Sequence, residues 1–128
     1  MGITLTDNAR NAAVNGIVDL IDVSGPGTLE IKSSASTVAG TAELAILTFP
    51  ATAFGAAASG VATAGTIVSE TSANAGTAGF YTVFDGVGAA VWQGLVATAA
   101  SDLNLSSVSI GAGDTVSISA FTLTVPAS

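Results

Sequence analysis

Carboxylates are the only abundant side chains in this chain that could do chemistry. The 128 residues include nine Asp and Glu, two basic residues (Arg10 and Lys32), and neither His nor Cys. The commonest general bases and all thiol nucleophiles are therefore missing. Asp19 and Asp22 lie one helical turn apart and could form a carboxylate pair of the kind that cleaves glycosides. On a short helix this spacing is more typical of a solvated face, so we expect no catalytic residues and no enzyme.

The candidates for a metal site are scattered oxygen ligands. Zinc would find no nitrogen or sulfur ligand in a chain without His and Cys. Calcium needs several clustered oxygens, and the nearest candidates are Asp102 with Asn104, and the isolated Asp85 and Asp114. Asp in a turn usually accepts a hydrogen bond from the backbone two residues on. We therefore expect no metal and no cofactor.

Trp92 is the one tryptophan and the one residue that suggests a carbohydrate-binding role. An exposed indole ring could serve as a stacking platform for a sugar. A core or interface aromatic on a strand is the more common use of such a residue. We favour this second interpretation and retain the first as an alternative.

The charge of the chain restricts its partners. The formal net charge is −7, and the acids are spread along the sequence. Binding to nucleic acid is not expected, because phosphate contacts need clustered Lys and Arg. An anionic membrane surface is disfavoured for the same reason. No targeting segment and no membrane-spanning run is expected from the sequence. With 9% charged residues, against about 25% in ordinary soluble domains, the chain resembles a building block more than a free enzyme.

One helix is predicted, over residues 7–23. Thr6 or Asp7 suits its N-terminus, and Gly25 with Pro26 suits its end. Apolar residues recur at spacings of three and four. The predicted apolar stripe consists of Ala9, Ala12, Ala13, Ile17, Leu20 and Ile21. We expect this stripe to pack against the rest of the domain, with docking on a neighbouring subunit as the alternative.

The remainder, residues 28–125, is predicted to be β-structure. Expected strands are 28–32, 44–49, 66–70, 80–84, 89–98, 106–110 and 115–125. Alternation predicts that Leu29 and Ile31 face inward while Glu30 and Lys32 face outward. The apolar run 44–49 is expected to be buried on both faces, and 115–125 is long enough for a principal strand. Tracts of small residues at 33–43, 56–65 and 71–79 are expected to form loops and to supply contacts with other subunits.

The turn spacing predicts the fold class. Strands separated by turns every 8–12 residues are typical of a β-sandwich or barrel. The length fits one domain. We therefore expect a mainly β protein, a single-domain β-sandwich or barrel over residues 1–128 with one N-terminal α-helix.

Four segments carry a family resemblance. They are Asn11-Ala12-Ala13 followed by Ile17–Asp22, then Leu44–Phe49 with Phe54–Ala57, then Ser101–Leu105, and finally Val116–Pro126. In this order the chain resembles small proteins encoded among the head genes of tailed bacteriophages, the capsid decoration or cement proteins. The resemblance implies a non-enzymatic virion protein with no catalytic residues. It also implies binding to the major capsid protein on the capsid exterior, commonly as a homotrimer, after assembly in the host cytoplasm.

Two other hypotheses stay open. A tail or neck component, such as a tube or adaptor protein, belongs to the same class of virion parts. A carbohydrate-binding or adhesive β-module would use Trp92 as its platform. Copy number separates the first from a decoration protein, and replacement of Trp92 tests the second.

Overall fold

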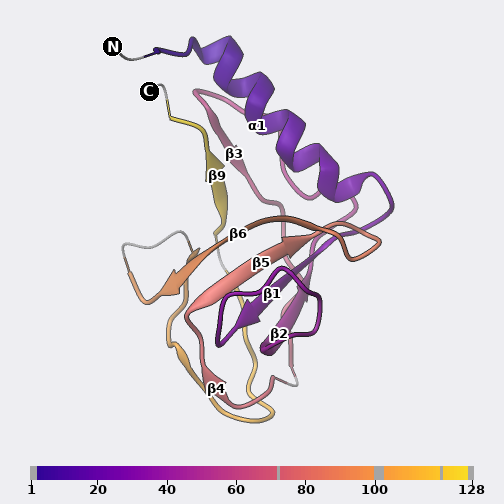
Figure 1. The fold of residues 1–128 in the computed structure, drawn as a ribbon, viewed down its shortest axis with the longest axis vertical. Coiled ribbons are helices and arrows are strands. Elements are labelled where there is room, and N and C mark those ends of the chain that lie inside the picture. The colour runs from indigo at the N-terminus through magenta and orange to yellow at the C-terminus, as the bar shows by residue number, and fades with distance from the viewer. Residues whose placement is uncertain (1–2, 72, 100–102, 119, 127–128) are drawn as a thin grey trace.

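A curled five-stranded β-sheet forms the middle of the molecule, and one helix lies across its upper end (Figure 1). The computed structural model describes residues 3–71, 73–99, 103–118 and 120–126. The mainly β architecture with one N-terminal helix confirms the fold class expected from the sequence.

The central sheet is built around strand β1. Its strands, in spatial order, are β2 (Glu43–Thr48), β1 (Thr28–Lys32), β5 (Phe80–Phe84), β6 (Ala90–Ala97) and β7 (Leu103–Asn104). Neighbours pair antiparallel except β6 and β7, which are parallel over two residues. The Asp85-Gly86 turn joins β5 to β6 as the sequence predicts, and Asp85 N–H donates to Ala89 O across it.

Two short antiparallel pairs extend the molecule above and below the sheet. Strand β3 (Val61–Thr63) pairs with β9 (Thr122–Thr124) beneath the helix, and β4 (Gly76–Thr77) pairs with β8 (Ser109–Ile110) at the opposite end (Figure 1). A tight turn precedes β3, in which Ala58 and Val61 exchange both backbone hydrogen bonds. Its central residues Ser59 and Gly60 have φ of 50° and 76°, the geometry of a type I′ turn.

Helix α1 (Asp7–Asp22) begins where the sequence predicts and ends one residue earlier. The Thr6 hydroxyl accepts from Ala9 N–H as the N-cap, and Gly25 adopts the φ of 100° that favours glycine after the helix. The predicted stripe is largely wrong, because Ala9, Ala12, Ala13 and Leu20 are exposed. The buried residues of the helix are Val14, Val18 and Ile21. These three residues lie at spacings of four and three, so they share one face of the helix, and the exposed Leu20 lies off that face.

The inner face of the sheet carries one continuous apolar core. Its inward side chains include Leu29, Ile31, Leu47, Val83 and Val96, all buried together with the helix residues. Five aromatic rings form one connected cluster in which Phe121 contacts each of the other four. This aromatic cluster consists of Phe49, Phe54, Tyr81, Trp92 and Phe121, with ring centroids 5.3–6.4 Å apart.

Three predicted strands are wrong in extent. The segment 115–125 is divided between an isolated bridge from Val116 to Glu70 and strand β9, so it forms no principal strand. The segment 66–70 makes only isolated bridges, and 106–110 is reduced to β8. The cause is a change of partner along each segment. Alternation in a sequence indicates that every second residue is buried. It does not indicate whether the same neighbouring strand pairs along the whole segment, so it does not predict the length of the strand.

Strand β2 is also less buried than expected. It lies at the edge of the five-stranded sheet. Leu44, Ala45 and Leu47 are buried, but Ile46 and Thr48 are exposed on the outer face. The apolar character of Ile46 therefore contributes to the surface and not to the core.

Candidate interaction surfaces

The carboxylate pair considered from the sequence does not form a reactive site. Asp22 is half-buried, and its two carboxylate oxygens accept from Ala53 N–H at 3.1 and 3.3 Å. Asp19 is exposed. Asp22 therefore fastens the end of α1 to the chain that follows β2, which is a structural task.

The acids placed in turns bond the backbone of those turns. Asp85 accepts from Val87 N–H and Ala89 N–H at 3.0 and 2.9 Å, and Asp114 accepts from Gly111 N–H at 2.7 Å. Asp102 lies outside the described residues, and its companion Asn104 is exposed on β7. Within the described ranges, no three acidic side chains lie close enough to hold a metal ion.

Trp92 is part of the aromatic cluster. Its ring stacks on Phe121 at 6.0 Å and contacts Phe54 at an angle of 57°. Its indole N–H donates to the Tyr81 hydroxyl at 3.1 Å. A sugar platform needs a free ring face, so these contacts favour the core interpretation of Trp92.

Asparagines on α1 dock the helix, a role that the sequence analysis missed. Asn11 accepts from Gly60 N–H at 2.8 Å, and Asn15 accepts from Ala57 N–H at 2.9 Å. The two lie four residues apart, on one face of the helix. The spacing of these asparagines and of Asp22 places three hydrogen-bonding side chains on one side of the helix. This pattern could have indicated from the sequence that this side packs against backbone. The small-residue tract 56–65 therefore packs against α1 within the molecule. The prediction that such tracts contact other subunits then applies to the tracts 33–43 and 71–79.

The outer face of the sheet holds a buried polar cluster, contrary to expectation. Glu30 and Lys32 were expected to face solvent, and no prediction was made for Thr82. All three side chains are buried, with exposed fractions of 3%, 0% and 0%. The reason is the loop 33–42, which we call the strap. It leaves β1, crosses the outer face and returns to β2 (Figure 1).

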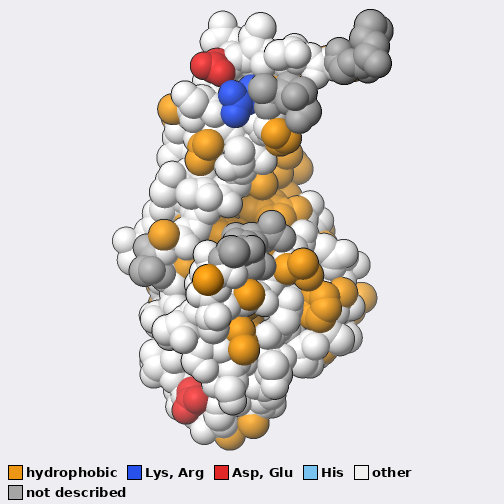
Figure 2. All heavy atoms as spheres, turned by 90° about the vertical axis from the view of Figure 1, so that its left-hand side faces the viewer, with side chains coloured by type: hydrophobic (Ala, Val, Ile, Leu, Met, Phe, Trp, Pro, Cys, Tyr) orange, Lys and Arg blue, Asp and Glu red, His pale blue; other side chains and the backbone are white. Residues whose placement is uncertain are grey.

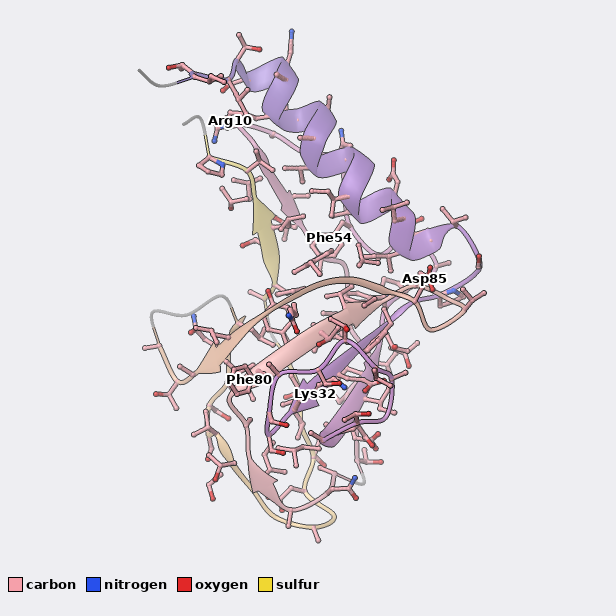
Figure 3. The ribbon with its side chains drawn as sticks, viewed as in Figure 1. Arg10, Lys32, Phe54, Phe80 and Asp85 are labelled. Atoms are coloured by element: carbon pink, nitrogen blue, oxygen red, sulfur yellow. The ribbon has the colours of Figure 1, made fainter. Side chains whose placement is uncertain are left out.

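Hydrogen bonds join the strap to this polar cluster. Lys32 Nζ donates to Glu30 Oε1 at 3.1 Å and to two strap carbonyls, Val38 O at 3.0 Å and Thr41 O at 2.8 Å. Gly40 N–H donates to Glu30 Oε1 at 2.9 Å. The Thr82 hydroxyl donates to Ser36 O at 2.7 Å. Figure 3 shows Lys32 at the centre of the sheet under the strap.

Burial of Lys32 leaves the described surface with one basic side chain. Arg10 lies near the top of the molecule (Figure 3), where it donates to Val125 O at 2.9 Å and pairs with Asp7 at 3.1 Å. Glu43 lies at the opposite end of β1 from the helix. Partial burial raises the pKa of Glu43 above its usual value, and the neighbouring carboxylates Glu30 and Glu70 raise it further.

Apart from Ile3 near the N-terminus, the exposed large apolar side chains lie in two regions of the described structure. The helix-end group consists of Leu20 and Val23 at the end of α1 and Val87 on the β5–β6 turn, all of which are exposed. The close approach of Gly86 to the Ser24 carbonyl brings these segments together. The outer-face group consists of Val38, Ile46, Val68 and Leu95. Figure 2 shows another face, the left-hand side of Figure 1, on which hydrophobic side chains also gather across the middle and charged side chains lie near the two ends.

A small cavity lies among residues 105–117. Its lining includes several hydroxyl side chains and Asp114, and its volume is about 100 Å³. Pockets for small molecules measure about 300–1,000 Å³, so this cavity is smaller than a typical ligand site.

Comparison with known proteins gives no match. No protein-family model, no curated protein and no solved structure is significantly similar to this chain. Within the described residues, α1 is too short and too polar to cross a membrane.

Proposed function

We propose that this chain is a bacteriophage virion structural protein, a capsid decoration protein that binds the outer surface of the major capsid protein lattice and stabilises the head. The supporting observation is the character of the described surface. It exposes large apolar side chains in two groups and offers a single, half-buried basic residue. The resemblance of four sequence segments to capsid decoration proteins is the reason for proposing a bacteriophage head as the particle.

The chemistry of the surface suits attachment. Many polar side chains that could react or bind a ligand are hydrogen-bonded to the backbone, as Asp22, Asp85 and Asp114 are. Interface cores are depleted in charge and enriched in apolar groups. A protein that binds only the assembled shell stabilises it by mass action. Many identical contacts on a symmetric lattice make the total effect large.

The proposed assembly is a homotrimer on the capsid. A trimer needs two different complementary surfaces that close a ring, and exposed apolar side chains occur both at the end of α1 and on the outer face of the sheet. A tail or neck protein remains the alternative within the same class. The contacts of Trp92 with Phe121 and Tyr81 leave the carbohydrate-binding module with less support.

A binding assay tests this proposal. Expanded capsids of the encoding phage, assembled without this chain, are mixed with the purified protein and pelleted. We expect saturable co-sedimentation at a copy number fixed by the coat lattice. Val87→Asp in the helix-end group and Val68→Asp in the outer-face group are compared with Thr63→Asp, an exposed polar control. Loss of binding in one or both apolar variants, but not in the control, supports the assignment. Failure of the unaltered protein to bind capsids overturns it.

A further inference from the structure

The strap is fastened to the sheet in an unusual way. Its described side chains are exposed or half-buried, and its largest apolar residue, Val38, is 63% exposed. The bonds that cross to the sheet are the four main-chain contacts made with Glu30, Lys32 and Thr82. Segments that bury little of their own apolar surface open at low free energy.

The base of the strap has the features of a hinge. Ser33 N–H donates to Ala42 O at 3.0 Å, so the two ends meet. Ala42 has φ of 55°, a left-handed conformation that is unfavourable for alanine. The β1–β2 register also shifts between Ile31 and Lys32, next to this residue. The strained residue and the register shift lie where the strap joins the paired strands.

We propose that residues 33–42 open and close over the outer face as one unit while the rest of the protein stays folded. Opening breaks only the strap contacts and exposes Glu30, Lys32 and Thr82 to solvent. Cross-strand pairing places Thr82 opposite Glu30, and Glu30 opposite Ile46. The strap therefore controls whether the outer face is continuous from Leu95 on β6 to Ile46 on β2. This inference does not depend on the proposed capsid role.

The chain offers a specific reporter of this motion. Lys32 is its only lysine, and its ammonium is inaccessible when the strap is closed. Acylation with N-hydroxysuccinimidyl acetate, followed by mass spectrometry of the peptide that contains Lys32, measures the open fraction. Local opening exposes little surface, so we expect a labelling rate that depends weakly on urea at low concentrations.

Two variants separate local from global opening. Thr82→Val removes the bond to Ser36 O and should raise the labelling rate about two- to tenfold. Val14→Ala weakens the core beneath α1, where Val14 is fully buried, and should leave the labelling rate at low urea unchanged. The proposal is overturned if Lys32 reacts only with the urea dependence of global unfolding, or if Val14→Ala accelerates its labelling.

Discussion

The buried ion pair under the strap gives the sharpest prediction about stability. Lys32→Met removes a fully buried ammonium with three acceptors, Glu30 Oε1, Val38 O and Thr41 O. The Glu30 carboxylate, 3% exposed, then loses its cation. Breaking a buried pair by removing one partner costs about 3–5 kcal/mol. We expect about 3 kcal/mol, at the lower end of that range, because an open strap would let water reach Glu30.

Urea unfolding followed by the fluorescence of Trp92 measures this cost. The indole is the only one in the chain and lies in the aromatic cluster, so its emission reports the packing of the core. With a slope of about 1–3 kcal/mol per molar urea, the midpoint should fall by about 1–3 M.

A double substitution and a control complete this test. Glu30→Leu with Lys32→Met replaces both charges by apolar groups and should be more stable than Lys32→Met alone. Asp7→Asn breaks the exposed pair with Arg10 and should change the free energy of unfolding by less than about 1 kcal/mol. A midpoint for Lys32→Met within about 0.3 M of the unaltered protein would show that the buried pair does not stabilise the fold in this way.

Three further predictions concern the helix, the sheet and pH. Asn15→Ala leaves Ala57 N–H without its acceptor and should lower the free energy of unfolding by about 1–3 kcal/mol. Asn8→Ala, on the exposed side of the same helix, should change it little, and thermal unfolding of the two variants measures the difference. Gly94→Ala places a methyl carbon 2.6 Å from the Tyr81 ring and should cost about 1–3 kcal/mol, whereas Gly16→Ala meets nothing within 4 Å and should add up to about 1 kcal/mol through helix propensity. The raised pKa of Glu43 means that the folded state binds its proton more tightly than the unfolded state, so its ionised form destabilises the fold as pH rises through that pKa. Glu43→Gln should therefore stabilise the protein at neutral pH, and this advantage should disappear below the ordinary pKa of 4.5. Urea midpoints of the variant and the unaltered protein should therefore differ at pH 8 and coincide at pH 3, and a constant or opposite difference would contradict the raised pKa.

Local signals in the sequence predicted the elements that one segment determines by itself. Thr6 and Gly25 set the limits of α1 within one residue. The β-formers of 28–32 and 80–84 gave β1 and β5 at their observed bounds. Asp85-Gly86 gave the turn after β5. In each case the residue type acts on its own backbone, so no knowledge of distant partners was needed.

Features that depend on distant segments were not predictable in this way. The strap turns the outward face of β1 into a buried one, so Lys32, which was expected to face solvent, is fully buried. The partners of 115–125 change along its length. The spacing of Asn11 and Asn15 indicates that they share one helix face. The N–H groups that they accept from belong to Gly60 and Ala57, more than 40 positions away, so these partners could not be predicted locally. For the candidate surfaces, the scarcity of charge follows from the composition, whereas the positions of the exposed apolar side chains depend on the fold.

Cryo-electron microscopy of virus particles that carry this chain tests the proposed capsid role. If the chain is a capsid decoration protein, we expect density that fits the curled sheet with α1, repeated on the outer surface of the head with the symmetry of the coat lattice. Density for this fold in the tail or neck, or a head exterior without it, would show that the proposal is wrong.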